Sequence, residues 1–97
     1  MTNFFGDYYL SSLTDVELTS NVDKRDGLGL TKLHRAARAG DFRSTMLLLS
    51  AGASIDAKSN DEYESTPLQL ACYASQLDMV AFLLRNGAQL EARDTLG

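Results

Sequence analysis

Apolar residues recur at helical spacing in two pairs of neighbouring segments. The second members of the pairs, residues 42–50 and 77–86, carry apolar side chains over more than half of a helix circumference: Phe42, Met46, Leu48, Leu49, and Leu77, Val80, Phe82, Leu83, Leu84. A helix that is apolar so far round is expected to be buried between neighbours. The first members, residues 32–39 and 67–75, each have one inner face, made by Leu33, Ala36, Ala37 and by Leu68, Ala71, Cys72. We therefore predict two antiparallel helix pairs, with Cys72 buried in its packed helix.

Residues that favour helix ends stand at the limits of these segments. Thr31 and Thr66 occupy N-cap positions, where a hydroxyl accepts a hydrogen bond from a free backbone N–H. Gly40, Gly52 and Gly87 follow three of the segments and tolerate the left-handed conformation that ends many helices. The boundaries of the helices are therefore predicted by local sequence.

The two pairs form a repeat with a period of 35 residues. A shift of 35 places Asp26 on Asp61, and it also superposes Thr31 on Thr66, Leu33 on Leu68, Ala36 on Ala71, and Gly52 on Gly87. A fixed period in this range is typical of stacked supersecondary units. Such stacks usually present an extended surface to a partner.

Both copies resemble the ankyrin repeat. The resemblance rests on T-K-L-H-R-A-A-R-A-G-D and L-L-L-S-A-G-A-S-I-D-A-K in the first copy, and on T-P-L-Q-L-A and L-L-R-N-G-A-Q-L-E-A-R-D in the second. It covers residues 22–97 and implies an all-α ankyrin-repeat solenoid, in which stacked helix-turn-helix units carry projecting β-hairpin fingers. The period exceeds the family's usual length of about 33 residues. The excess places two extra residues, near Ser59 and Asn60, in a finger that should be longer and more mobile.

The resemblance divides the chain into four parts. Residues 1–25 are an N-terminal capping or extension segment that is partly helical, residues 26–60 and 61–93 are two ankyrin repeats, and residues 94–97 begin a truncated third repeat. Arg35 stands where the second repeat has Leu70. A charged residue there indicates a first repeat without a full repeat in front of it, because terminal repeats are polar on their outer side.

Within the N-terminal segment, aromatic residues at near-helical spacing predict a short amphipathic helix over residues 3–13. Thr14 and Glu17 form a capping-box pattern for another short helical turn. The aromatic residues either cover the apolar flank of the first repeat or form a docking face of their own.

Composition narrows the class of protein. The chain has 97 residues and a net charge of −4, whereas nucleic-acid-binding domains are basic. Its longest apolar run, residues 79–84, is far too short to cross a bilayer. The single cysteine cannot form an internal disulfide, which fits a reducing compartment. We expect a small folded domain in the cytoplasm or the nucleus, with no membrane insertion.

The candidate chemical motifs have structural interpretations. Gly27 to Lys32 resembles a phosphate-binding loop but lacks the third glycine and the flanking strand. His34 has no partners at metal-ligand spacing, and a zinc site needs three or four ligands; the ankyrin resemblance assigns it to bonds with Thr31 and the neighbouring hairpin. Asp61, Glu62 and Glu64 lack the spacing of a calcium loop. We expect no catalysis, no cofactor and no metal.

The resemblance implies that the chain binds another protein through its finger tips and the exposed face of the first helix in each unit. Carried onto this sequence, the positions are Gly27, Leu28, Leu30, Arg38, Ala39, Glu62, Tyr63, Ser65, Tyr73, Ala74, Thr95 and Leu96. Tyr63 and Tyr73 are the strongest candidates, because tyrosine is a favoured hot-spot residue. Arg35, Arg38 and Arg43 are either a solvated surface or an anchor for an acidic partner segment.

Two further interpretations stay open. The chain could be the N-terminal regulatory or recruitment part of a larger enzyme or channel whose activity lies beyond Gly97. Two repeats also leave an apolar flank open at the C-terminal end, since solenoids usually need about three units to bury a continuous core. That flank gives a possible route to self-association.

Overall fold

The computed structural model describes residue 10 and residues 13–89. These residues contain five α-helices and no strand. The helices are α1 (Asp15–Thr19), α2 (Lys32–Ala39), α3 (Phe42–Ser50), α4 (Pro67–Tyr73) and α5 (Leu77–Arg85). The predicted all-helical repeat stack is confirmed.

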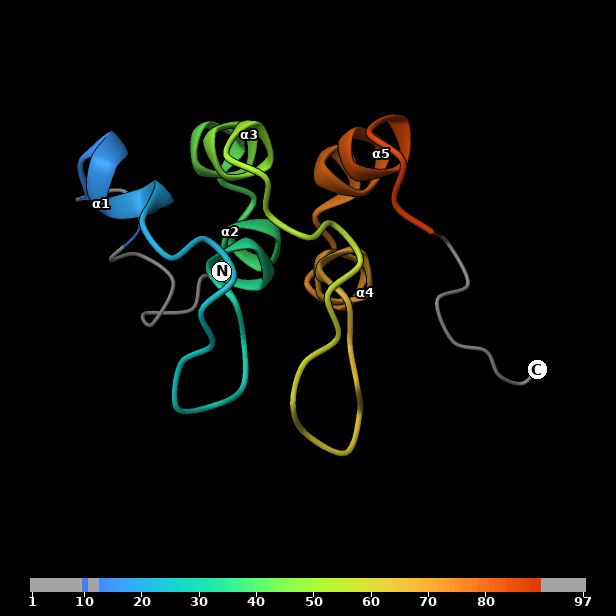
Figure 1. Cartoon of the computed structure of the whole chain (residues 1–97). Helices are drawn as coiled ribbons and strands as arrows, with labels where there is room; N and C mark the ends of the chain where they lie inside the picture. The colour runs from blue at the N-terminus through green and yellow to red at the C-terminus, as the bar shows by residue number, and fades with distance from the viewer. Residues whose placement is uncertain (1–9, 11–12, 90–97) are drawn as a thin grey trace.

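The helices form two layers, with loops projecting from one of them. The inner helices α2 and α4 pack side by side, and α3 and α5 return over them as the outer layer, with α1 beside α3 (Figure 1). Two long loops, the fingers, project from the inner layer away from the outer helices. We call residues 25–30 finger 1 and residues 58–65 finger 2.

The predicted caps form in both repeats. The hydroxyl of Thr31 accepts from the backbone N–H of His34 at 3.3 Å, and that of Thr66 accepts from Gln69 at 3.2 Å. In each case the third helical residue bonds back to the cap, which completes a capping box. Thr14 caps α1 in the same way, as the sequence pattern predicted.

The helix ends follow the backbone conformation of the residues after them. Gly40 has φ of 73° and ends α2, while Gly52 and Gly87 follow α3 and α5 with φ of 96° and 97°. α4 ends at Tyr73, two residues before the predicted limit, because Ser75 takes a left-handed φ of 59°. α5 likewise ends one residue early, at Arg85.

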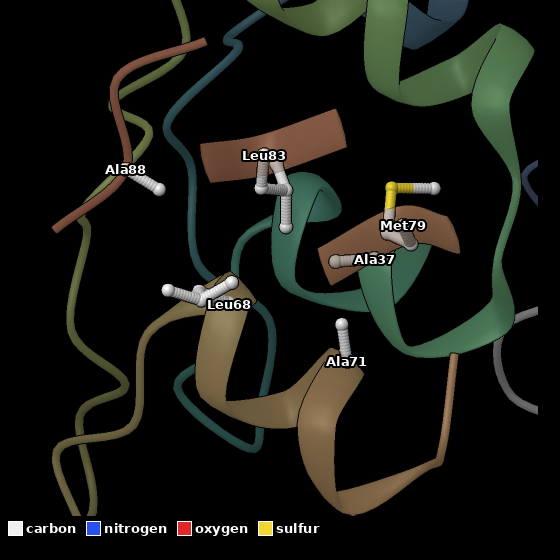
Figure 2. Close-up of a cluster of buried hydrophobic side chains, with 6 residues drawn as sticks. All are labelled: Ala37, Leu68, Ala71, Met79, Leu83 and Ala88. Atoms are coloured by element: carbon white, nitrogen blue, oxygen red, sulfur yellow. The ribbon is translucent and has the colours of Figure 1, made fainter. Parts of the chain in front are cut away.

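Two buried clusters hold the stack together. One joins both repeats and contains Ala37, Leu68, Ala71, Met79, Leu83 and Ala88, which gather between α2, α4 and α5 in Figure 2. The other joins the first repeat to the N-terminal segment and contains Leu10, Leu18, Leu33, Ala36 and Leu48. Because each cluster spans a boundary between units, neither repeat buries its apolar face alone.

The outer helices are less buried than their composition predicted. Leu77 is 72% exposed, Met46 53% and Phe42 39%. In a two-layer stack an outer helix touches the inner pair and its outer neighbours only, so its remaining face meets solvent. Two small polar residues take buried positions instead: Ser44 and Thr45 bond to Asp41 at the start of α3.

The prediction that Cys72 is buried is wrong, because its side chain is exposed. Its counterpart Ala37 is fully buried, since the second repeat packs on it through Leu68 and Ala71. Cys72 occupies the same position in the second repeat, where no further described residue covers it. Burial at this position therefore depends on the next unit in the stack.

The segment before the first repeat joins the stack through a contact that recurs between the two repeats. The carboxylate of Asp23 accepts from the backbone N–H of Ser54 at 3.0 Å, and that of Asp56 accepts from Gln89 at 2.9 Å. The recurrence supports our proposed division, in which residues 1–25 act as a reduced unit that caps the first repeat. Leu10 and Leu18 cover the flank of that repeat.

Other parts of these expectations concern residues outside the described ones. The aromatic residues Phe4, Phe5, Tyr8 and Tyr9, which gave the predicted helix over residues 3–13, lie there, and so do residues 94–97 of the proposed third repeat.

Candidate interaction groove

A groove of about 530 Å³ lies between the two fingers and the inner helices. Its lining residues are Leu28, Leu30, Arg38, Ser59, Asp61, Tyr63, Ser65, Leu70 and Tyr73. Six of them belong to the predicted binding positions: Leu28, Leu30, Arg38, Tyr63, Ser65 and Tyr73. Residues from finger 1, finger 2, α2 and α4 thus meet at one surface.

The groove has exposed aromatic and aliphatic walls. Tyr73 is 76% exposed, Tyr63 73% and Leu28 66%. Leu30 and Ser65 are almost completely buried and line the deeper part. Large exposed side chains above a well-packed base are the arrangement in which protein interfaces concentrate their binding energy.

Finger 1 is a turn built around Asp26. The backbone N–H of Gly29 donates to the Asp26 carbonyl at 2.9 Å, and one carboxylate oxygen accepts from the N–H of Leu28 and Leu30 at 2.8 and 3.1 Å. Arg35 donates to the other carboxylate oxygen. Burial raises the pKa of Asp26, but the hydrogen bonds from Arg35, Leu30 and Leu28 outweigh it and hold the pKa below its usual value. A carboxylate that stays ionised therefore fixes the shape of finger 1.

Finger 2 repeats this device with Asp61. One Asp61 carboxylate oxygen accepts from the Ser59 hydroxyl at 2.7 Å and from the N–H of Tyr63 and Glu64 at 3.0 and 3.1 Å. These bonds, led by that from Ser59, lower the pKa of Asp61. Ser59 and Ser65 then close the base of the finger, where the Ser59 N–H donates to the Ser65 carbonyl at 2.7 Å.

The two fingers touch at Gly29 and Asn60. The Asn60 N–H donates to the Gly29 carbonyl at 3.0 Å. A Cβ on Gly29 would lie only 2.6 Å from the Asn60 Cβ, so the approach requires glycine. Asn60 and Ser59 are the residues near which the sequence placed the two-residue excess. Both residues are held by hydrogen bonds: Asn60 bonds to finger 1, and Ser59 bonds within finger 2.

His34 joins α2 to finger 2. Its Nδ1 accepts from the Thr31 N–H at 3.1 Å, so Nε2 carries the proton and donates to the Ser65 carbonyl at 2.7 Å. Burial lowers the pKa of His34 below its usual value, although the bond to Ser65 acts in the opposite direction. His34 is thus a buried neutral link between repeats, in the structural role that the family resemblance implied.

The remaining predicted positions lie away from the groove lining. Gly27 and Glu62 are exposed near the finger tips, Ala39 is half-buried, and Ala74 is buried. Thr95 and Leu96 are outside the described residues.

Sequence reasoning missed three lining residues, Ser59, Asp61 and Leu70. The two-residue excess in the repeat was the available signal for Ser59. Asp61 was visible as the repeat counterpart of Asp26 and as part of an acidic cluster, and Leu70 only as the counterpart of Arg35.

The three arginines of the first helix pair do not form one surface. Arg35 is largely buried against Asp26, and Arg43 lies on the outer layer, where it donates to Asp15 at 2.7 Å. Only Arg38 lines the groove. The charges that the sequence suggested as a joint anchor are therefore divided between different parts of the fold.

The described residues lack two kinds of feature. No group of three or more His, Cys, Asp or Glu residues among them could hold a metal ion. In the same part of the chain, no helix combines the length and the apolar character needed to cross a membrane.

Comparison with known proteins agrees with this architecture. A family profile described as ankyrin repeats (3 copies) matches residues 8–94. The chain is 40% identical over 68 residues to the transient receptor potential cation channel subfamily A member 1 homolog of Caenorhabditis elegans, which covers 70% of this chain and 6% of that protein. It is 38% identical over 86 residues to the B-cell lymphoma 3 protein homolog of Mus musculus, covering 87% of this chain and 19% of that protein.

A shorter relative is protein phosphatase 1 regulatory subunit 27 of Homo sapiens, which is 35% identical over 69 residues, or 71% of this chain and 44% of that protein. The chain thus spans less than half the length of each of these three relatives. Because the family profile covers most of the sequence and the helices stack as two-layer repeats, the chain belongs to the ankyrin repeat family.

Proposed function

We propose that this chain binds a partner protein in the groove between its two fingers, without catalysis of its own. Ankyrin repeats are a general protein-binding module, and the finer assignment rests on one observation. Residues from two repeats, which the sequence selected separately, line a single groove with Tyr63 and Tyr73 exposed in its walls.

The groove is suited to binding because its shape is fixed before a partner arrives. The Asp26 and Asp61 turns, the bond from Asn60 to Gly29, and the His34 link to finger 2 restrain both walls. A preorganised surface loses less conformational freedom on association. Tyr63 and Tyr73 can then contribute large contact areas.

The test uses the immobilised 97-residue chain to capture proteins from an extract of its source cells, followed by titration of a captured protein against purified variants. Tyr63→Ala and Tyr73→Ala should each weaken binding by ~1–3 kcal/mol. Both side chains are exposed, so the melting temperature should stay close to that of the parent. Arg85→Ala is the control, since Arg85 lies on the outer helix α5. A partner lost on changing Arg85 but indifferent to both tyrosines would contradict the assignment.

A second candidate function is recruitment or regulation within a larger enzyme or channel. The observation that favours it is the small share of each relative that this chain covers, 6% for the channel homolog. The test is the mass of the native protein on a denaturing gel of source cells, detected with an antibody against this chain. A band near 10.6 kDa would count against the larger protein. The same antibody tests our proposed location in the cytoplasm or nucleus by microscopy.

We also propose weak self-association through the C-terminal flank, where Cys72 and Tyr73 of α4 are exposed. Sedimentation velocity over a range of concentrations should show a growing dimer fraction. A strictly monomeric chain at high concentration would exclude this contact.

A further inference from the structure

Tyr63 differs from the other groove tyrosine in its backbone and in its neighbours. It lies in the turn of finger 2, whereas Tyr73 is the last residue of α4. The two side chains are almost equally exposed, at 73% and 76%. Asp61, Glu62 and Glu64 flank Tyr63, while the residues around Tyr73 are uncharged. From these differences we propose that Tyr63 is a phosphorylation site for a protein tyrosine kinase.

The position of Tyr63 gives a kinase access to the phenol and to the backbone on both sides. Finger 2 projects away from the helices (Figure 1), and the backbone hydrogen bond from Ser59 to Ser65 closes its base. Beyond the bond from Asn60 to Gly29 of finger 1, the tip is held by local bonds to Asp61. The Asp61 carbonyl accepts from the Glu64 N–H, and its carboxylate accepts from the Ser59 hydroxyl and from the N–H of Tyr63 and Glu64. A kinase can therefore extend the tip without opening the helical core, because only local contacts are lost. Tyr73 offers no such route, since extending its backbone would unwind the end of α4.

The negative charge around Tyr63 favours one class of tyrosine kinase. Exposed carboxylates on both sides of the acceptor complement a kinase whose substrate cleft is basic. In the transfer, the phenolic oxygen attacks the γ-phosphorus of ATP and forms a new P–O bond. The bond from that phosphorus to the β–γ bridging oxygen breaks, ADP leaves, and the phenolic proton passes to a base of the kinase. The product carries ~1.5–2 added negative charges at neutral pH.

The modification bears directly on the groove, because Tyr63 is one of its lining residues. The added phosphate turns an aromatic wall into an anionic one in a groove whose lining includes Arg38. It therefore alters the charge that a partner meets, although the modification itself does not require that the groove bind anything.

The experiment incubates the folded 97-residue chain with Mg-ATP and a tyrosine kinase domain that phosphorylates a glutamate–tyrosine copolymer. Peptide mapping by mass spectrometry then locates the phosphate and separates Tyr63 from Tyr73, Tyr8 and Tyr9. We expect Tyr63 to be modified at least tenfold faster than Tyr73. Tyr63→Phe should abolish the signal from the finger 2 peptide, and Tyr73→Phe should leave it unchanged.

A charge variant tests the role of the acidic neighbours. Glu62→Gln with Glu64→Gln keeps the shape of the side chains and spares Asp61, which holds the turn. It should lower the initial rate at Tyr63 about fivefold, the size expected from two exposed charge interactions. Three results would each overturn the proposal. They are an unchanged rate in this variant, equal modification of Tyr73 and Tyr63, and no modification of Tyr63 while the copolymer is phosphorylated in the same tube. None of these readings involves a binding partner, so they leave the proposed binding function to its own test.

Discussion

Gly29→Ala tests whether the close contact between the fingers is needed for stability. Gly29 has φ of 80°, and an added Cβ would lie 2.6 Å from the Asn60 Cβ and 2.9 Å from the Asn60 nitrogen. A left-handed conformation costs a non-glycine residue ~1–2 kcal/mol. The clash also separates the fingers and breaks the hydrogen bond from Asn60 to Gly29, which contributes ~0.5–1.5 kcal/mol. We expect a loss of about 1.5–3.5 kcal/mol in the free energy of unfolding.

Two other glycines serve as matched controls in the same urea denaturation assay. Gly52 has φ of 96° with nothing within 4 Å of an added Cβ, so Gly52→Ala carries the backbone cost alone. Gly27 has neither a positive φ nor a nearby atom, so Gly27→Ala should be neutral or stabilising by up to ~1 kcal/mol. The predicted order of stability is therefore Gly27→Ala, then Gly52→Ala, then Gly29→Ala.

Amide hydrogen exchange separates the contact between the fingers from general destabilisation. The Asn60 N–H should exchange faster in Gly29→Ala than in Gly52→Ala when both are compared at equal global stability. If Gly29→Ala unfolds like Gly52→Ala and protects Asn60 equally well, then the fingers do not depend on this approach and the reasoning is refuted.

Three further outcomes are expected. Leu83→Ala should cost ~2–5 kcal/mol in urea denaturation because Leu83 is fully buried, whereas exposed Leu77→Ala should cost under ~0.5 kcal/mol; similar costs would contradict the core assignment. Because the folded-state pKa of His34 lies below the unfolded value of 6.5, the unfolded chain binds more protons below that pH. Stability should therefore be complete above pH 6.5 and fall as the pH drops toward the folded pKa, and His34→Gln should flatten this part of the melting-temperature profile; a parent profile already flat there would exclude the linkage. Finally, a thiol reagent should label Cys72 without denaturant, and labelling only after unfolding would show that Cys72 is covered.

The sequence by itself determined where α2 to α5 begin and where α2 and α3 end. Thr31 and Thr66 cap α2 and α4, and Gly40 ends α2, because capping depends on side chains and backbone conformations within one turn of the helix. The repeat period then predicted the order of the units, and the role of His34 was implied by the ankyrin resemblance. It also identified Tyr63 and Tyr73 as exposed surface residues.

Only the tertiary structure decided which equivalent residues are covered and how the fingers meet. Cys72 and Ala37 occupy the same position in their repeats, yet only Ala37 is buried, because the next unit packs on it. The exposure of Leu77 follows from the two-layer arrangement, which no periodicity of a single helix encodes. The contact between Gly29 and Asn60 joins residues 31 positions apart. Local sequence fixes hydrogen bonds within a turn, whereas burial and contacts between units depend on which surfaces the stack brings together.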